Sequence, residues 1–193
     1  RRILPLIAVI ALGLAVLAGV AWKSGLVSEP ASAGPGGPFQ LVDQTGKPQT
    51  ERLLKGKWTV VFFGYTYCPD VCPTTLAALG QAQSILGPKA KDLQVVFVSV
   101  DPERDKVQQM AAYLNNDSFP KGTIGLTGTP EQVAAAAKAY RVYYAKDGEG
   151  SAYQVNHSSA AYLMDPKGRF ARVLAFGIGP DEIARQISDA MAG

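Results

Sequence analysis

Runs of consecutive apolar residues alternate along this chain with segments whose apolar residues recur at helical spacing. The runs at residues 58–63 (WTVVFF) and 93–100 (LQVVFVSV) are rich in β-branched and aromatic residues, a pattern typical of strands buried on both faces of a sheet. A segment with helical periodicity follows each run, the first beginning at Pro73 and the second covering residues 107–114. These patterns predict a central sheet covered by helices.

The remaining elements are shorter and depend on turn and capping signals. In chain order we expect a small hairpin opening at Phe39, a minor strand at 124–126, a helix capped by Thr129, a hairpin over 142–155, antiparallel strands at 160–164 and 170–175, and a helix from Pro180. This order predicts an α/β sandwich with a mixed sheet, parallel first and antiparallel last. The plan is similar to that of thioredoxin-like proteins.

The N-terminal stretch differs from the rest because residues 3–22 contain no charged side chain. A helix of this length spans roughly 30 Å, the thickness of the hydrocarbon core of a bilayer. Arg1 and Arg2 precede it, and the positive-inside rule places such an N-terminus in the cytoplasm. We therefore expect a transmembrane anchor at 3–22, with a secretion signal cleaved after Ala33 as the alternative.

A segment rich in Pro, Gly, Ser and Ala follows at residues 23–38, and we expect a flexible linker there. The folded domain is expected to cover residues 39–193. Both interpretations of the N-terminus place this domain on the exported side of the membrane. That location is the periplasmic face of an inner membrane, or the intermembrane-space face of the mitochondrial inner membrane in a eukaryote.

The charge of the chain excludes one class of partner. The formal net charge is +3, and Lys and Arg are interspersed with acidic residues along the sequence. A nucleic-acid-binding protein would gather its basic residues in a patch or stripe. We therefore expect no nucleic-acid partner.

The sequence contains two cysteines, Cys68 and Cys72, in the stretch YTYCPDVCP that follows the first buried strand. At a strand-to-helix junction, unpaired backbone N–H groups and the helix dipole favour the thiolate over the thiol. A structural disulfide here would close a loop of about five residues and would stabilise the fold by only about 2 kcal/mol or less. The position therefore favours a functional pair, either a redox-active dithiol or part of a metal site.

His157 is the one histidine of the sequence, and it precedes the predicted strand at 160–164. In thioredoxins the corresponding segment carries a proline that lies against the cysteine pair, and no proline occurs at this point of the chain. We expect the imidazole to lie beside the two sulfurs, and an isolated surface histidine is the alternative. Two thiolates and one imidazole suit Cu(I), or Cu(II) with an added oxygen ligand, better than zinc, which usually has four protein ligands.

Three motifs together resemble one known family: WTVVFF followed by YTYCPDVCP, SVDPERD at 99–105, and VNHSSAAYLMDPKG at 155–168. They are similar to those of the Sco family, also called SenC or PrrC in bacteria. The resemblance implies a membrane-anchored, thioredoxin-like copper metallochaperone that delivers copper to the dinuclear copper centre of cytochrome c oxidase. It also implies that Cys68, Cys72 and His157 are the copper ligands.

Three further residues are candidates for the surroundings of the site. Asp101 belongs to the DPERD motif, which the resemblance places near the metal, although an Asp before Pro also commonly begins a turn. Asp70 lies between the cysteines, where it either tunes the thiols or is simply solvated. Asn156 stands where the family often has Asp, so the site would be less negative than in typical members.

The resemblance implies the copper-bearing subunit of cytochrome c oxidase as the receiving partner, with another periplasmic copper carrier as a candidate donor. A second function uses the same residues. As a thiol-disulfide oxidoreductase, Cys68 and Cys72 would reduce the cysteine pair of the oxidase subunit before copper enters. His157 separates the two functions, since copper binding requires it and disulfide exchange does not.

Overall fold

The computed structural model describes residues 34–193. Within this range no helix is both long enough and apolar enough to cross a membrane. The predicted anchor at residues 3–22 and most of the predicted linker at 23–38 lie outside the described residues.

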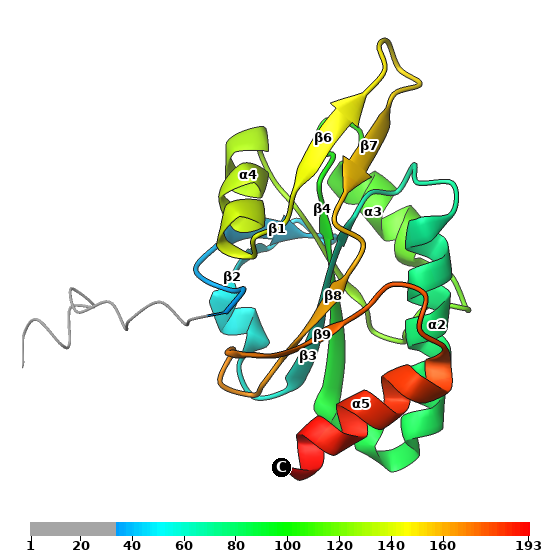
Figure 1. Cartoon of the computed structure of the whole chain (residues 1–193). Coiled ribbons are helices and arrows are strands. Elements are labelled where there is room, and N and C mark those ends of the chain that lie inside the picture. The colour runs from blue at the N-terminus through cyan, green and yellow to red at the C-terminus, as the bar shows by residue number, and fades with distance from the viewer. Residues whose placement is uncertain (1–33) are drawn as a thin grey trace, which may run out of the picture. The chain divides into compact units, whose positions relative to one another are not determined.

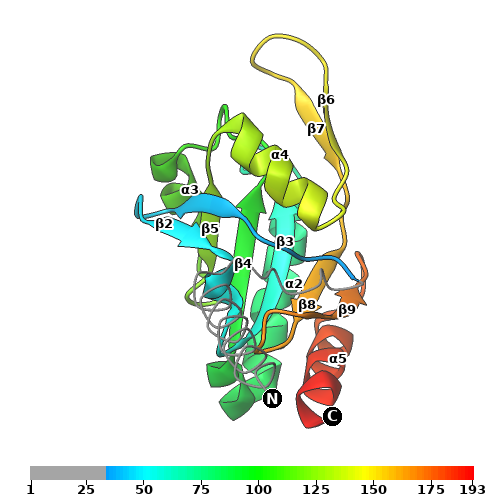
Figure 2. The ribbon, with the colours of Figure 1, turned by 90° about the vertical axis from the view of Figure 1, so that its left-hand side faces the viewer.

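A mixed sheet forms the centre of the domain, and its strands are β1 (Gln40–Asp43), β2 (Pro48–Thr50), β3 (Trp58–Gly64), β4 (Leu93–Ser99), β5 (Ile124–Thr127), β8 (Ala161–Met164) and β9 (Phe170–Leu174). Their order across the sheet is β2-β1-β5-β4-β3-β8-β9; Figure 1 views the sheet nearly edge-on, and Figure 2 shows its strands side by side. The neighbours β3 and β4, and likewise β4 and β5, are parallel, whereas the other neighbouring pairs are antiparallel. The predicted α/β sandwich with a mixed sheet is confirmed. The small hairpin expected to open the domain is confirmed as the antiparallel pair β1 and β2, and β1 also pairs in antiparallel fashion with β5.

Helices cover both faces of this sheet: α2 (Val71–Leu86), α3 (Val107–Leu114) and α5 (Pro180–Ala192) on one side and α4 (Pro130–Ala139) on the other (Figures 1 and 2). Two short 3₁₀ segments, η1 (Glu51–Leu54) and η2 (Gly87–Asp92), complete the connections. The predicted cap of α4 is confirmed, because Thr129 and Gln132 form a reciprocal capping box. The predicted start of α2 at Pro73 was wrong, since the helix begins at Val71. A proline is tolerated there because the first backbone N–H groups of a helix have no partner within it.

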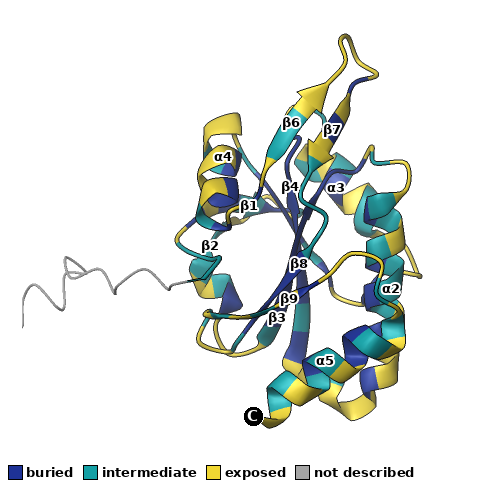
Figure 3. Cartoon of the chain, viewed as in Figure 1, coloured by how far each residue is buried: buried dark blue, intermediate teal, exposed yellow. Residues whose placement is uncertain are grey.

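The inner strands and helices bury a continuous apolar core (Figure 3). Phe62 of β3 and Phe97 of β4 are register partners, and their ring centroids lie 5.9 Å apart. On α5, Ile183 and Ile187 are buried, as the helical spacing predicts. The strand expected to be minor at 124–126 is β5, an internal strand between β4 and β1. The sequence signal there is weak because Gly125 has no side chain, and α3 packs closely against that position.

A separate hairpin stands apart from this sheet and projects beyond it (Figures 1 and 2). Its strands are β6 (Tyr144–Asp147) and β7 (Gln154–His157), which pair in antiparallel fashion. The expected hairpin is therefore confirmed. Its residues around the tip are mostly exposed, whereas His157 lies at its base opposite Tyr144.

Gly80→Ala is expected to destabilise the domain, although alanine normally favours a helix interior. Gly80 lies in α2, and an added Cβ would lie 2.3 Å from the backbone oxygen of Ser118. Overpacking costs about 1–3 kcal/mol, and the cost lies at the upper end here because the clash is with backbone atoms, whereas helix propensity gains only about 1 kcal/mol. Chemical denaturation measures the difference. Gln81→Ala on an exposed position of the same helix is the control, and its effect should stay within about 0.5 kcal/mol. A Gly80→Ala domain as stable as the wild type would contradict the prediction.

Candidate metal centre

The two cysteines lie where β3 ends and α2 begins. Cys72 is in the first turn of α2 and is fully buried, whereas Cys68 is in the preceding loop and is partly exposed. Two residues four positions apart within one helix would project from the same face. Because Cys68 lies before the helix begins, the two sulfurs do not do so. Instead the loop folds back, and the Cys72 backbone N–H donates to Cys68 Sγ at 3.5 Å. Both residues are free thiols.

His157 reaches the cysteines from the base of the projecting hairpin. Its Nε2 atom lies 3.5 Å from Cys72 Sγ, and its Nδ1 atom lies 2.9 Å from the carbonyl oxygen of Ser158. A carbonyl can only accept, so Nδ1 carries a proton in this contact, and Nε2 is the ring nitrogen directed at the Cys72 sulfur. The rings of Tyr65 and Phe62 contact the imidazole edge-on, with centroids 5.9 and 6.4 Å away. The ring is thus oriented by contacts on several sides.

The three donor atoms of Cys68, Cys72 and His157 lie within 4.8 Å of one another. Within residues 34–193 they form the single cluster of three or more potential metal-ligating side chains. Metal–sulfur and metal–nitrogen bonds measure roughly 2.0–2.3 Å, so donors on one ion are separated by up to about 4.6 Å. Small side-chain movements are sufficient to close the three donors around an ion. Two thiolates and one imidazole form a soft donor set of low coordination number, which fits copper.

The two thiols differ strongly in acidity. A hydrogen bond from the Cys72 thiol is the largest influence on Cys68, and together with backbone N–H donors and the nearby His157 it outweighs burial and lowers the pKa of Cys68 to about 5. The same hydrogen bond, with burial, raises the pKa of Cys72 far above that of an ordinary thiol. Cys68 is therefore a thiolate at neutral pH, and Cys72 remains protonated.

This difference predicts selective alkylation of the reduced, metal-free protein by iodoacetamide. The rate at Cys68 should rise with pH around a midpoint near 5 instead of near 9.0, because the lowered pKa keeps the thiolate present at lower pH. Cys72 should react slowly at the same pH values, since it is buried and protonated. Peptide mass spectrometry measures both rates, with the protein unfolded in guanidinium as the control in which the two thiols become alike. A Cys68 rate that rises only above about pH 8 would contradict the prediction.

The other predicted residues lie at defined places outside the three-residue cluster. Asp101 is buried and bonds to Arg104 and Tyr153. Asp70 is exposed at the N-cap of α2, where its carboxylate accepts a hydrogen bond from Thr74 Oγ1 at 3.2 Å. Asn156 is exposed on β7 and donates to Asp147 across the hairpin at 3.3 Å.

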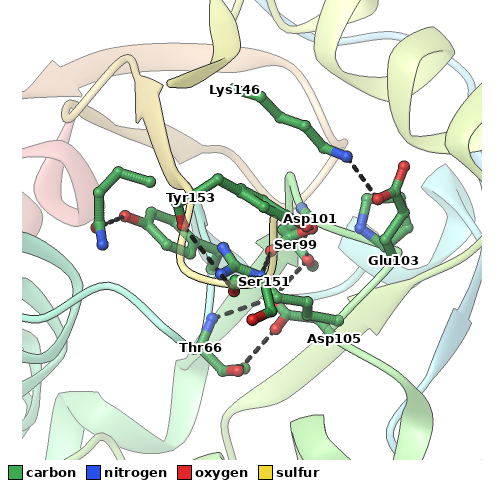
Figure 4. A network of polar contacts seen from close by, with 12 residues as sticks. Thr66, Ser99, Asp101, Glu103, Asp105, Lys146, Ser151 and Tyr153 are labelled. Atoms are coloured by element: carbon green, nitrogen blue, oxygen red, sulfur yellow. Dashed lines mark hydrogen bonds and ion pairs between the residues drawn. The ribbon is translucent and has the colours of Figure 1, made fainter. Parts of the chain in front are cut away.

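Sequence reasoning missed a buried polar network beside the site, which includes Thr66, Asp105, Arg104 and Tyr153 (Figure 4). Asp105 accepts from the backbone N–H and the hydroxyl of Thr66 at 3.0 and 2.7 Å. A signal was present in the chain. Thr66 follows β3 and the two aspartates of DPERD follow β4, and the carboxyl ends of adjacent parallel strands meet at one edge of a sheet. The partner Tyr153, on the distant hairpin, has no comparable local signal.

Comparison with known proteins identifies similar sequences. A sequence model of the family described as SCO1/SenC matches residues 28–192. The mitochondrial protein SCO1 homolog 1 of Arabidopsis thaliana is 47% identical over 151 residues, which are 76% of this chain and 45% of that protein. The chain spans about half the length of the curated relatives that it matches.

Solved structures share the fold. The crystal structure of Arabidopsis thaliana ScoI with copper bound is 41% identical, with a TM-score of 0.77, and the match covers 82% of this chain and 99% of that one. BsSco, described as a member of the Sco family of cytochrome c oxidase assembly proteins with a disulfide switch, is 28% identical with a TM-score of 0.66. That match covers 86% of this chain and 98% of BsSco. The thioredoxin-like fold predicted from the order of elements agrees with both structures.

Proposed function

The chain belongs to the SCO1/SenC family, and from this membership and its metal centre we propose that it is a copper metallochaperone. Cys68, Cys72 and His157 hold one copper ion, and the protein delivers it to the dinuclear copper site of cytochrome c oxidase during assembly. The observation that carries the proposal is the approach of three soft donor atoms to within 4.8 Å. The copper-bound Arabidopsis relative supports copper as the ion.

A three-donor site suits transfer better than storage. An ion held by three ligands has room for a fourth, so a ligand of the receiving protein binds before one of this chain's ligands leaves. Cys68 is partly exposed and Cys72 is fully buried. The incoming ligand therefore reaches the Cys68 side first, and the buried Cys72 thiolate is the last sulfur to release the ion.

Delivery to a membrane-embedded oxidase also requires the right location. We infer that residues 3–22 form a single transmembrane anchor and residues 23–38 a flexible linker, with the domain at 39–193 on the exported face. The receiving partner is the copper-bearing oxidase subunit, which the assembly role of the Sco family supports. Extraction of the full chain from membranes by detergent but not by alkaline carbonate tests the anchor.

Copper titration of residues 34–193, which lie within one compact unit, tests the main proposal. With both thiols reduced, Cu(I) should bind in a ratio of about one ion per chain, and X-ray absorption should report two sulfur ligands and one imidazole nitrogen. The same protein alkylated selectively at Cys68 is the control, and it should bind copper much more weakly. A wild-type domain that does not retain copper against a competing chelator would sink the proposal.

A second function rests on the difference between the two thiols. Cys68 is an accessible thiolate, and Cys72 is a buried thiol beside it. In reduction of a partner disulfide, Cys68 Sγ attacks one partner sulfur and the other leaves as a thiolate. Cys72 then gives its proton to the partner thiolate that has left and attacks the Cys68 sulfur, which releases the second partner sulfur as a thiolate and leaves a Cys68–Cys72 disulfide. Two electrons pass from this chain to the partner.

His157→Ala separates the two functions. Removal of the imidazole should lower copper affinity by more than about a hundredfold, beyond the loss typical for a residue outside the ligand set. Reduction of a model disulfide peptide should change by less than about threefold, because the sulfurs remain. If the variant still supports oxidase assembly in cells, the oxidoreductase function is the working one and copper delivery fails as the explanation.

A further inference from the structure

One short loop begins and ends with a buried aspartate, and the two aspartates bond to different segments: Asp105 to Thr66 and Asp101 to Tyr153 (Figure 4). The loop runs from Asp101 to Asp105 between β4 and α3, and the Asp105 N–H donates to the Asp101 carbonyl oxygen at 2.9 Å. The two residues are 1% and 0% exposed. Burial of a carboxylate costs free energy unless the group is hydrogen-bonded. The hydrogen-bond partners of the two aspartates therefore explain why the fold tolerates them.

Asp105 holds the loop that carries the first cysteine. Its carboxylate accepts from the Thr66 N–H at 3.0 Å, from the Thr66 hydroxyl at 2.7 Å and from the Ser99 hydroxyl at 2.7 Å. Gln109 on α3 donates to the Thr66 hydroxyl at 3.0 Å. Thr66 stands two positions before Cys68, so these bonds define where the chain turns toward the sulfur.

Asp101 holds the hairpin that carries the histidine. Its carboxylate accepts from the Tyr153 hydroxyl at 2.6 Å and from Arg104 Nε at 2.5 Å. Arg104 Nη1 in turn donates to the carbonyl oxygens of Ser151 and Tyr153 at 3.2 and 3.0 Å. The guanidinium also lies over the Tyr153 ring, 3.6 Å from its centroid. Ser151 and Tyr153 lie in the segment just before β7, and the last residue of β7 is His157.

The hairpin needs such contacts because its backbone does not pair with the central sheet. β6 and β7 form a sheet of their own within the described chain, and His157 is 85 positions from Cys72. A direct contact from the Tyr65 hydroxyl to Gln154 at 2.8 Å adds to the same attachment. A further pair between Glu103 and Lys146 is exposed on both sides, and exposed pairs contribute little.

We propose that Asp101 and Asp105 are positioning residues that together set the distance between the two sulfurs and the imidazole. Asp105 acts through Thr66 on the cysteine loop, and Asp101 acts through Tyr153 and Arg104 on the histidine hairpin. We call the contacts of Asp105 with Thr66 the cysteine arm, and the contacts of Asp101 with Tyr153 and Arg104 the histidine arm. Because both arms begin in one short loop, a displacement of either arm changes the spacing of the donor atoms. The copper readout of this inference rests on the proposed function, whereas its metal-free readout does not.

Two conservative variants of the full chain remove one arm each. Tyr153→Phe deletes the hydroxyl that donates to Asp101 and keeps the ring beneath Arg104. In the reduced, metal-free protein, amide hydrogen exchange over residues 154–157 should become about tenfold faster, with residues 65–68 unchanged. Glu103→Gln is the matched control, since it removes an exposed ion pair between the same loop and the same hairpin.

Thr66→Val deletes the hydroxyl that donates to Asp105. Exchange over residues 65–68 should become about tenfold faster, with residues 154–157 unchanged. Thr45→Val is the matched control, because the Thr45 hydroxyl also donates to an aspartate, Asp43 at 2.6 Å, in the β1–β2 turn at the far edge of the sheet.

Copper affinity then tests the two arms together. Cu(I) affinity should fall about ten- to a hundredfold in both Tyr153→Phe and Thr66→Val and should stay at the wild-type value in both controls. Faster exchange throughout the domain in either variant would overturn the inference, since it would indicate general destabilisation. Local exchange changes with wild-type copper affinity would overturn it as well. If the wild-type chain itself does not bind copper, the proposed function fails, and the metal-free exchange pattern alone decides the inference.

Discussion

Cys72→Ser is expected to abolish tight copper binding while the domain remains folded. Cys72 is the buried centre of the site, with its sulfur 3.5 Å from His157 Nε2 and its backbone N–H on Cys68 Sγ. A serine hydroxyl has nearly the same shape, but it is a hard donor that stays protonated at neutral pH and does not suit Cu(I). The affinity should therefore fall by more than about a hundredfold, a larger loss than removal of a residue outside the ligand set causes. Competition titration with a Cu(I) chelator measures it.

The control for this substitution is Ser84→Ala, which changes an exposed hydroxyl on the same helix. Its copper affinity should equal that of the wild type. Thermal unfolding of the metal-free Cys72→Ser protein should show one cooperative transition, which establishes that the loss is local. A folded Cys72→Ser domain that binds copper as tightly as the wild type would falsify the assignment of Cys72 as a ligand.

Gly64→Ala should displace the Cys72 sulfur, although Gly64 has no side chain that could bind a metal. Gly64 ends β3, and an added Cβ would lie 2.7 Å from both Cys72 Sγ and Phe97 Cε2. Phe97 is 0% exposed and sits in the packed core, so the sulfur has to move. We expect a stability loss of about 1–3 kcal/mol from overpacking and a copper affinity lower by about ten- to a hundredfold.

Gly179→Ala is the matched control for this prediction, because a Cβ at that position would have no atom within 4 Å. It should leave copper affinity unchanged. Denaturation and chelator competition together check Gly64→Ala. Wild-type copper affinity in Gly64→Ala would contradict the view that the absence of a side chain at the end of β3 provides the space for the Cys72 sulfur.

Much of the fold follows from local pattern. The apolar runs at 58–63 and 93–100 became β3 and β4, and the Thr129 cap became the start of α4, because strand burial and helix capping depend on residues close in sequence. The internal strand β5 was expected to be minor. It contains Gly125, and its place depends on pairing with β4 and on packing by α3, which are contacts with distant segments.

For the candidate site, the sequence by itself determined the inventory: two cysteines at a strand-to-helix junction and one histidine before a late strand. Only the tertiary structure decided that Cys72 is buried beside His157 while Cys68 faces outward as the more acidic thiol. It also decided that the two aspartates of DPERD bond to different segments, Asp105 to Thr66 and Asp101 to Tyr153. The reason is physical: burial, pKa and hydrogen-bond partners depend on which distant segments the fold packs together, and no local spacing of residues records that.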